Sequence, residues 1–319
     1  MSKKILLMLF SLFMAVALVA CGTGDDSNDD TTGTGGSGDE GATDEGTAEL
    51  PDEIIMGFVP STDAEKIADN IGPISDKLSE ILGVQVSGQV MTNFSALVEA
   101  MGNDQVHIGF IPAFGYVLAT ERYDNVEVIL KSIRHGSGTY RAQYTVRADS
   151  DIQTLEDLEG KIWAFADITS TSGYLFPAAQ FMDEFGVEQA EDFVGDVVPT
   201  GNHDNALITV LEGDADFATT FEDARTNIVG DYPDAMDELR QLDFTDEIPN
   251  DTISVNTNLL NQELVDQIYE AFMSFNEDEE MLHALDEIYN WTGIDKATDD
   301  EYDVIRSVYE KFSDSPAFQ

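Results

Sequence analysis

From residue 54 onwards, the chain alternates short apolar runs with longer amphipathic stretches. The first apolar run, 54–59, is closed by Pro60, and Ser61-Thr62-Asp63 then begins an amphipathic helix that continues to Leu82. The same pattern predicts strands at 84–91, 106–111, 126–133 and 140–147, and helices at 93–101 and 114–121. Strands that alternate with helices in this way indicate a parallel sheet with helices on both faces.

A second series of the same kind begins at Lys161. It predicts strands from 161, at 194–199 and at 216–221, with helices through about Phe185 and at 203–211. An extended segment, 248–255, then returns the chain to the first series, and the end is helical at 262–275, 279–289 and 302–312. The pattern therefore predicts two α/β lobes joined by two crossings, with a cleft between them. We place the first lobe at 51–147, the second lobe at 148–247, and the return to the first lobe at 248–319.

Residues 1–20 have the pattern of a secretory signal peptide. Two lysines precede an apolar stretch that is too short to span a membrane as a helix. The stretch ends in Leu18-Val19-Ala20-Cys21, which resembles a bacterial lipobox, so we expect Cys21 to carry a lipid. As the only cysteine, Cys21 cannot form an internal disulfide, and the alternative is a free thiol.

The segment that follows the cysteine has a composition that cannot form a core. Residues 22–50 contain nine acidic residues and eight glycines but no Lys, Arg or aromatic residue. We therefore expect 21–50 to be a lipidated cysteine followed by a disordered acidic, glycine-rich tether. The folded part would then be anchored at the outer face of a cell membrane, outside the cytoplasm.

The charge of the remaining chain limits its partners. Residues 51–319 contain 54 acidic and 13 basic residues, which gives a formal net charge of −41. Nucleic acid and anionic lipid are poor partners for such a surface. The long-range field also opposes an anionic ligand, but salt at about 0.15 M limits that field to about 8 Å. A site built from local amides, hydroxyls and a few cations can therefore still bind an anion.

A candidate anion site follows the strand that begins at Lys161. Ser170, Thr171, Ser172 and Gly173 stand in succession at the predicted start of a helix. A helix start presents free N–H groups and a positive dipole end, the hydroxyls can donate hydrogen bonds, and the glycine permits close approach to the backbone. The alternative is that one of the hydroxyl residues only caps the helix, but three in a row exceed what capping needs.

Four segments, taken in order, resemble one protein family. They are the runs AFADITSTSGYLFP at 164–177, GNHDNAL at 201–207, GDADFATTFEDAR at 213–225 and IPNDT at 248–252. Together they resemble the substrate-binding proteins of phosphonate, phosphite and phosphate ABC transporters, and the resemblance covers nearly all of 51–312. It implies the type II periplasmic-binding fold, in which each lobe is a mostly parallel sheet flanked by helices. It also implies ABC permease and ATPase subunits as partners.

The resemblance assigns roles to particular residues. It implies that Ser170, Thr171 and Ser172 hold the ligand's oxygens and that His203, at the start of the next helix, assists them. Asp223 matches a carboxylate that faces the ligand's substituent, and Asp251 matches one at the crossing between lobes.

On the first-lobe side, the sequence departs from the family pattern. Phe94 and Ile111 occupy positions where aminoalkylphosphonate binders place tyrosines against the ligand. The loss of two phenolic O–H groups weakens the case for an aminoalkylphosphonate.

The carboxylates and arginines fit a monoprotonated ligand. Asp251 could accept a hydrogen bond from a P–O–H group and so favour such a ligand over sulfate, which has no proton to donate. Asp223 either does the same or caps the helix that begins near Glu222. One of the arginines near the cleft segments could supply positive charge, although each alone is more typical of a structural ion pair. These arginines are Arg134, Arg141 and Arg225, with Arg141 as the candidate.

The sequence favours binding over catalysis. The four histidines lack His-Glu-x-x-His spacing, and neither the serine-hydrolase nor the phosphate-loop glycine motif occurs. A triad could be drawn from Ser172, His203 and Asp223, but a carboxylate aimed at the ligand argues against it. We therefore expect a monomeric solute-binding lipoprotein, without cofactor or metal, that delivers a small phosphorus oxyanion to an ABC permease. The alternatives are a lipoprotein that presents its ligand to a membrane sensor, or a binder of another small anion.

Overall fold

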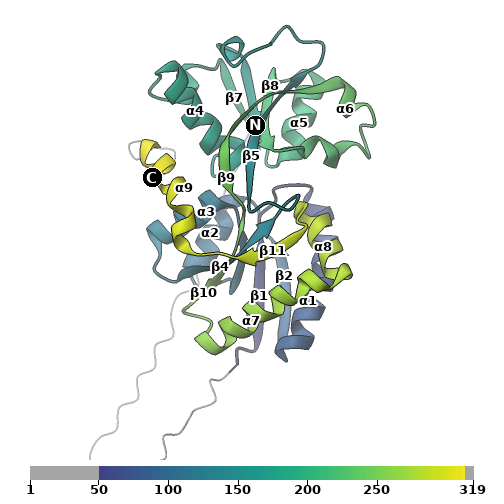
Figure 1. Ribbon diagram of the computed structural model, residues 1–319, viewed down its shortest axis with the longest axis vertical. Coiled ribbons are helices and arrows are strands. Elements are labelled where there is room, and N and C mark those ends of the chain that lie inside the picture. The colour runs from purple at the N-terminus through teal and green to yellow at the C-terminus, as the bar shows by residue number, and fades with distance from the viewer. Residues whose placement is uncertain (1–49, 313–319) are drawn as a thin grey trace, which may run out of the picture. The chain divides into compact units, whose positions relative to one another are not determined.

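The computed structural model describes residues 50–312. These residues form two β-sheets, each covered by helices (Figure 1). The predicted signal peptide, Cys21 and nearly all of the predicted tether lie outside the described residues. Within 50–312, none of the helices combines the length and the apolar character that a membrane span requires.

The first sheet has the strand order β11-β4-β10-β3-β1-β2. The strands are β1 (Glu53–Phe58), β2 (Gln85–Val90), β3 (Ile108–Ile111), β4 (Val126–Ile133), β10 (Thr252–Asn256) and β11 (Gly293–Lys296). β1 runs parallel to β2 and β3, whereas β10 is antiparallel to both β3 and β4. One side of the sheet carries α2 (Phe94–Gly102) and α3 (Ala113–Arg122), with α9 (Asp303–Tyr309) packed on α3. The other side carries α1 (Ala64–Leu82), α7 (Gln262–Ser274) and α8 (Glu279–Tyr289).

The second sheet has the order β7-β6-β8-β5-β9. The strands are β5 (Thr139–Arg147), β6 (Ile162–Phe165), β7 (Asp196–Pro199), β8 (Phe217–Phe221) and β9 (Leu239–Pro249). β6 is parallel to β7 and β8, and β5 is antiparallel to β8 and β9. The helices are α4 (Phe176–Phe185), which continues a π-helical turn at Thr171–Leu175, α5 (His203–Glu212) and α6 (Ala235–Glu238).

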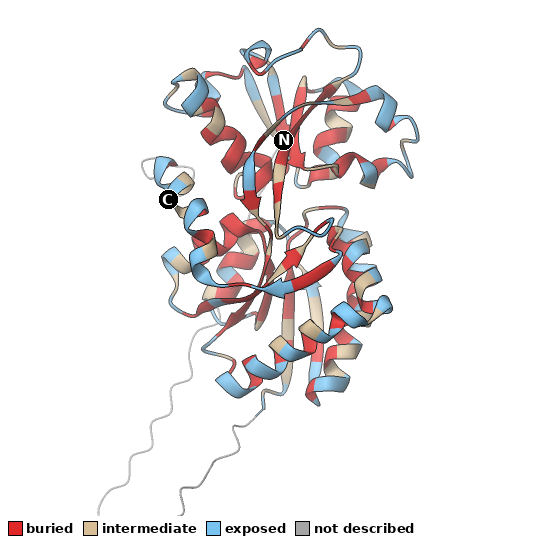
Figure 2. Ribbon diagram, in the orientation of Figure 1, coloured by how far each residue is buried: buried red, intermediate tan, exposed pale blue. Residues whose placement is uncertain are grey.

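Local sequence explains where α1 begins and ends. The Asp63 side chain accepts a hydrogen bond from Lys66 N–H at 2.9 Å, and the helix stops at Gly83, whose φ of 68° suits glycine. Between these ends, the apolar side chains recur every three or four residues and are buried against the sheet. Each contributes roughly 1.5–3 kcal/mol by leaving water. Buried residues gather in the same way along both sheets and the inner faces of their helices (Figure 2).

Two short segments cross between the sheets, 134–138 after β4 and 250–251 before β10. The Asn250 side chain ties them together, because its Nδ2 donates to Ser132 O and Ser137 O, both at 2.8 Å. The first crossing turns at His135 and Gly136, with φ of 49° and 78°. The crossings therefore lie side by side and are held by shared hydrogen bonds.

The expected two-lobed α/β fold class is confirmed, but two details differ. β5 pairs with β8 and β9 in the second sheet, although the sequence analysis placed 140–147 in the first lobe. Each sheet is also parallel on one side only, because β10 and β5 enter antiparallel to their neighbours. Apolar periodicity locates a strand without indicating its partner or its direction, and for this reason the first of the two predicted crossings was expected after residue 147 and not before β5.

Candidate anion site

The hydroxyl segment forms the start of the helix that follows β6. Ser170 is the N-cap, and its Oγ accepts a hydrogen bond from Gly173 N–H at 3.0 Å. Tyr174 N–H and Leu175 N–H both bond to Ser170 O at 3.1 Å, which widens the first turn into a π-helix. The N–H groups of Thr171 and Ser172 stand at the helix start, where no intrahelical acceptor is in reach. A π-turn of this kind is frequent at functional sites.

Gly173 serves the turn itself and does not line the cavity described below. A Cβ at this position would lie 2.8 Å from Ser170 Oγ and 3.0 Å from Ser170 Cβ. The glycine therefore allows the cap to pack closely against the turn, whereas the sequence analysis expected it to let a ligand approach.

The three hydroxyl residues line a small inner cavity. It has a volume of about 20 Å³. On the same measure a single water needs roughly 10–15 Å³, so the inner cavity has room for about one water and would have to widen to admit a tetrahedral oxyanion. Its lining residues are Ser61, Phe94, Pro112, Arg134, Tyr140, Ser170, Thr171, Ser172, His203, Phe221 and Asp251. The structure thus brings together six of the predicted site residues, namely Phe94, Ser170, Thr171, Ser172, His203 and Asp251.

His203 enters the inner cavity from the first position of α5. Its backbone N–H donates to Ser61 O at 3.0 Å, and its Nε2 lies 3.4 Å from Ser170 Oγ. Burial, reinforced by the charge of Arg134, lowers the pKa of His203 to about 3, so the ring is neutral at physiological pH. Its Nδ1 is buried and has no hydrogen-bond partner among residues 50–312. The neutral ring can therefore offer one N–H donor to an anion but no charge.

An ion pair from the two crossings supplies the charges of the inner cavity. Arg134 Nη2 lies 2.7 Å from Asp251 Oδ2, and both side chains are largely buried. Arg134 also donates from Nε to Tyr289 O at 3.3 Å. Because His203 is neutral, the charges of Arg134 and Asp251 cancel, and the lining has no formal net charge. An anion would be held here by oriented dipoles and hydroxyls.

Tyr140 adds a phenolic group that the sequence analysis did not single out. Its side chain lines the inner cavity beside the hydroxyl groups of Ser172 and Thr171. Burial, followed by the nearby charge of Asp251, raises the pKa of Tyr140, so its O–H proton is retained. The signal that could have identified it is its position directly after the first crossing, two residues beyond Gly138.

Besides Gly173, three predicted residues lie outside the inner cavity. Ile111 is fully buried in β3, next to Pro112. Arg141 pairs with Glu222 at 2.7 Å, stacks over the Phe244 ring at 3.9 Å and is 40% exposed. The Asp223 side chain makes no helix cap and instead contacts Gln241 Nε2 at 3.0 Å and Arg225 Nη2 at 3.5 Å. Among the three arginines considered, only Arg134 lines the inner cavity.

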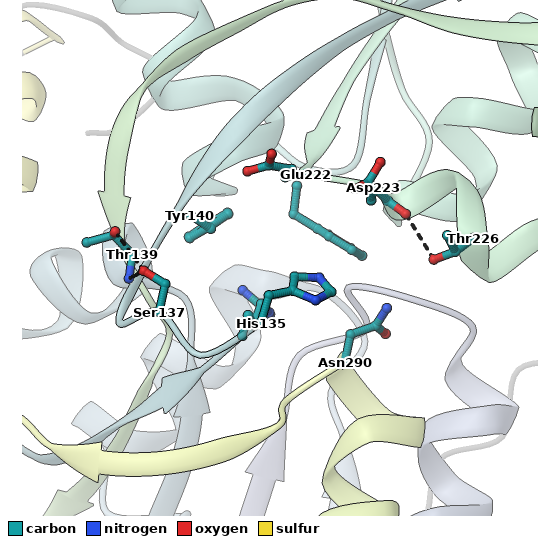
Figure 3. Close-up of a pocket in the computed structure, with 10 residues that line it drawn as sticks. His135, Ser137, Thr139, Tyr140, Glu222, Asp223, Thr226 and Asn290 are labelled. Carbon is teal, nitrogen blue, oxygen red and sulfur yellow. Dashed lines mark hydrogen bonds between the residues drawn. The ribbon is translucent and has the colours of Figure 1, made fainter.

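Asp223 lines a second, larger outer pocket next to the inner cavity (Figure 3). The outer pocket has a volume of about 370 Å³. His135, Ser137 and Thr139 reach it from the first crossing and the start of β5, Glu222 and Asp223 follow β8, and Asn290 comes from the end of α8. Its remaining lining residues are Arg134, Tyr140, Phe221 and Thr226. Within 50–312, no cluster of His, Cys, Asp or Glu is arranged to hold a metal ion.

Two α/β lobes with a small polar cavity lined by both of them have the architecture of a two-lobed solute-binding protein. A family model described as "ABC transporter, phosphonate, periplasmic substrate-binding protein" matches residues 56–302, so the chain belongs to this family. The expected family resemblance is thereby confirmed. Membership makes the chain the extracytoplasmic binding component of an ABC importer for small phosphorus oxyanions, with permease and ATPase partners.

Individual relatives agree with this assignment. The chain is 26% identical over 280 residues to the phosphate-import protein PhnD of Mycolicibacterium smegmatis, covering 82% of this chain and 87% of the relative. Its fold is similar to that of a binding protein of an ABC phosphonate transporter from Pseudomonas aeruginosa, with a TM-score of 0.74, 20% identity and coverage of 85% and 90%. It is also similar to PhnD1 from Prochlorococcus marinus, solved with methylphosphonate, with a TM-score of 0.72, 19% identity and coverage of 82% and 98%.

Proposed function

We propose that the inner cavity is the binding site and that it holds a monoprotonated phosphorus oxyanion. The observation that carries this proposal is the meeting of three hydroxyl side chains, a helix start, a neutral histidine and the Arg134–Asp251 pair around about 20 Å³. The ligand's oxygens would accept hydrogen bonds from Ser170, Thr171 and Ser172 and from the helix N–H groups.

Asp251 gives the site a reason to prefer a ligand with a proton. Its Oδ2 faces Arg134, and within 50–312 its Oδ1 accepts no hydrogen bond. Oδ1 would accept one from a P–O–H group, whereas sulfate at neutral pH would meet it without a proton between them. Sulfate is therefore disfavoured although its shape is similar.

The same geometry supports a binding protein that is not an enzyme. Asp223 lines the outer pocket and not the inner cavity, so it does not orient His203 as a triad aspartate would. Among the described residues 50–312, His203 Nδ1 has no carboxylate partner of the kind that such a general base needs. The protein would act as a monomer that binds and releases its ligand unchanged.

Calorimetric titration of the full chain in detergent with phosphite, phosphate, methylphosphonate and sulfate tests the ligand class. We expect at least one phosphorus ligand to bind with a dissociation constant at least 100-fold below that of sulfate. If sulfate binds as tightly as the best phosphorus ligand, the proposed role of Asp251 is wrong. If none of the four ligands binds, the proposed site is wrong.

The proposed anchor is the lipid on Cys21, which is supported by the Leu18-Val19-Ala20-Cys21 motif. We predict that Cys21→Ser releases the protein from membranes without changing its ligand affinity, because stable anchoring needs the acyl chains. Membrane fractionation after a salt wash measures the first effect, and titration of the released protein measures the second. Retention of the variant in the membrane fraction would contradict the anchor.

A further inference from the structure

The inner cavity and the outer pocket share one wall. Arg134, Tyr140 and Phe221 line both of them, and we call these three side chains the partition. The two carboxylates that the family pattern places near a ligand lie on opposite sides of it. Asp251 lines only the inner cavity, and Asp223 lines only the outer pocket.

The partition is a stack of three flat groups. The Arg134 guanidinium carbon lies 5.2 Å from the centre of the Tyr140 ring and 5.5 Å from the centre of the Phe221 ring. The three side chains come from different segments, the first crossing, β5 and the end of β8. Each is at least nine-tenths buried, so the stack is a packed wall.

Each member of the partition is also fixed by a neighbour in the inner cavity. Arg134 is held by Asp251 of the inner cavity and also by Tyr289 O, and Tyr140 lies beside Ser172 and Thr171. The Phe221 ring meets the His203 ring edge to face at 5.1 Å. A ligand that displaced the partition would therefore break contacts that the oxyanion site itself needs.

The outer pocket has the chemistry for a cationic substituent, but the partition separates it from the inner cavity. Asp223 supplies a carboxylate there that is 46% exposed, Glu222 supplies one that is paired with Arg141, and about 370 Å³ is enough for an alkylamine chain. An oxyanion in the inner cavity could reach these carboxylates only through the partition.

We propose that the partition is the specificity-determining element of this site, an inference that rests on the function proposed above. It confines the ligand to phosphorus oxyanions whose fourth substituent is oxygen, hydrogen or methyl, and it excludes aminoalkylphosphonates. Phe221 is the member to test, since Arg134 also carries charge and Tyr140 also carries a hydroxyl group.

The experiment compares methylphosphonate, propylphosphonate and 2-aminoethylphosphonate by calorimetry on the full chain and on Phe221→Ala. We expect the wild type to bind methylphosphonate at least about 100-fold more tightly than either larger ligand, at the upper end of what pocket size alone achieves. In Phe221→Ala this ratio should fall to about tenfold or less, and 2-aminoethylphosphonate should gain more than propylphosphonate because Glu222 and Asp223 become accessible to its amine. Phe244→Ala is the matched control, since Phe244 lines neither cavity, and it should keep the wild-type ratio.

The outcomes separate this inference from the proposed function. If the wild type binds 2-aminoethylphosphonate within about threefold of methylphosphonate, the partition does not select and only this inference is wrong. If no phosphorus ligand binds, the proposed function fails, and this inference fails with it. If Phe221→Ala does not fold, Phe221→Leu replaces it. A folded variant that keeps the wild-type ratio contradicts the inference.

Discussion

The two lobes contribute different chemistry to the inner cavity. The second lobe supplies the hydroxyls of Tyr140, Ser170, Thr171 and Ser172 and the ring of His203, whereas the first lobe supplies the apolar surfaces of Phe94 and Pro112. Ser61 of the first lobe already uses its carbonyl oxygen to accept from His203 N–H. The difference indicates that the second lobe recognises the oxyanion and the first lobe covers it and excludes water.

The largest expected change in ligand selectivity comes from a substitution in the crossings, which connect the two lobes. Asp251→Asn removes the partner of Arg134 and leaves the inner cavity with a net positive charge. We expect phosphite to bind more weakly, because its P–O–H group loses the carboxylate acceptor, and sulfate to bind more tightly, because the repelling carboxylate is gone. The ratio of their affinities should therefore fall by about 100-fold, or about 2.7 kcal/mol. Competition titrations measure the ratio.

Asp295→Asn serves as the control for this charge change, because Asp295 is exposed on β11. It should leave the ratio unchanged. An unaltered ratio in Asp251→Asn would show that the carboxylate does not face the ligand.

A somewhat smaller effect tests the second lobe alone. Ser172→Ala removes one hydroxyl donor, and charge-assisted hydrogen bonds are worth roughly 1.5–3 kcal/mol, so phosphite and phosphate should both bind about 10- to 100-fold more weakly. Ser170→Ala should do the same and also destabilise the fold by about 1 kcal/mol, because Ser170 caps the helix.

A first-lobe substitution completes this comparison. Phe94→Leu keeps an apolar surface, so it should change the affinity for phosphite and for sulfate by a similar factor. Unchanged affinity in Ser170→Ala and Ser172→Ala would contradict the role of the second lobe in recognising the oxyanion. A strong change of selectivity in Phe94→Leu would contradict the role of the first lobe as a cover.

The smallest effect concerns contacts between the lobes outside the inner cavity. Asp204 of α5 accepts from Asp63 N–H at 3.1 Å and from Asn227 Nδ2 at 3.2 Å, and Asn290 of the first lobe donates to Asn227 Oδ1 at 3.1 Å. Burial raises the pKa of Asp204 to about 6, and the negative charge of the Asp63 carboxylate adds to this rise. The hydrogen bonds from Asn227 and from the Asp63 backbone N–H oppose it, as does the positive charge of Lys66.

A raised carboxyl pKa means that the folded protein binds more protons than the unfolded chain between about pH 4 and pH 6. The contribution of Asp204 to stability is therefore greatest below about pH 4 and falls by about 2 kcal/mol or less as the pH rises to 6. Thermal unfolding of Asp204→Asn should lack this part of the pH dependence when compared with the wild type. Parallel pH profiles for the two proteins would contradict it.

The residues that sequence reasoning grouped correctly around the inner cavity are those whose signals are contiguous in the chain. The hydroxyl segment, His203 at a helix start and Asp251 at a crossing each have a local signal, and all of them line the inner cavity. Arg134 and Arg141 could not be separated in this way, because the choice depends on the strand partner of β5 and hence on which side chains face the cleft.

Tyr140 and Phe221 were missed for the same reason. In sequence each is an aromatic residue in a β-strand, which is most often core. Their packing against Arg134 is a tertiary contact that no local pattern encodes.

The Arg134–Asp251 pair takes one charge from each crossing, and this fixes the order in which a bound anion would lose its contacts. Atoms close to a rotation axis move least, and an opening of the lobes would turn about the two crossings that Asn250 ties together. Phe94, which the first lobe contributes from the start of α2, would withdraw from the second-lobe hydroxyls and admit water. The ion pair would stay almost in place and release the anion last. A permease that pulls the lobes apart would therefore expose the ligand to water on its first-lobe side before its contacts with Arg134 and Asp251 are broken.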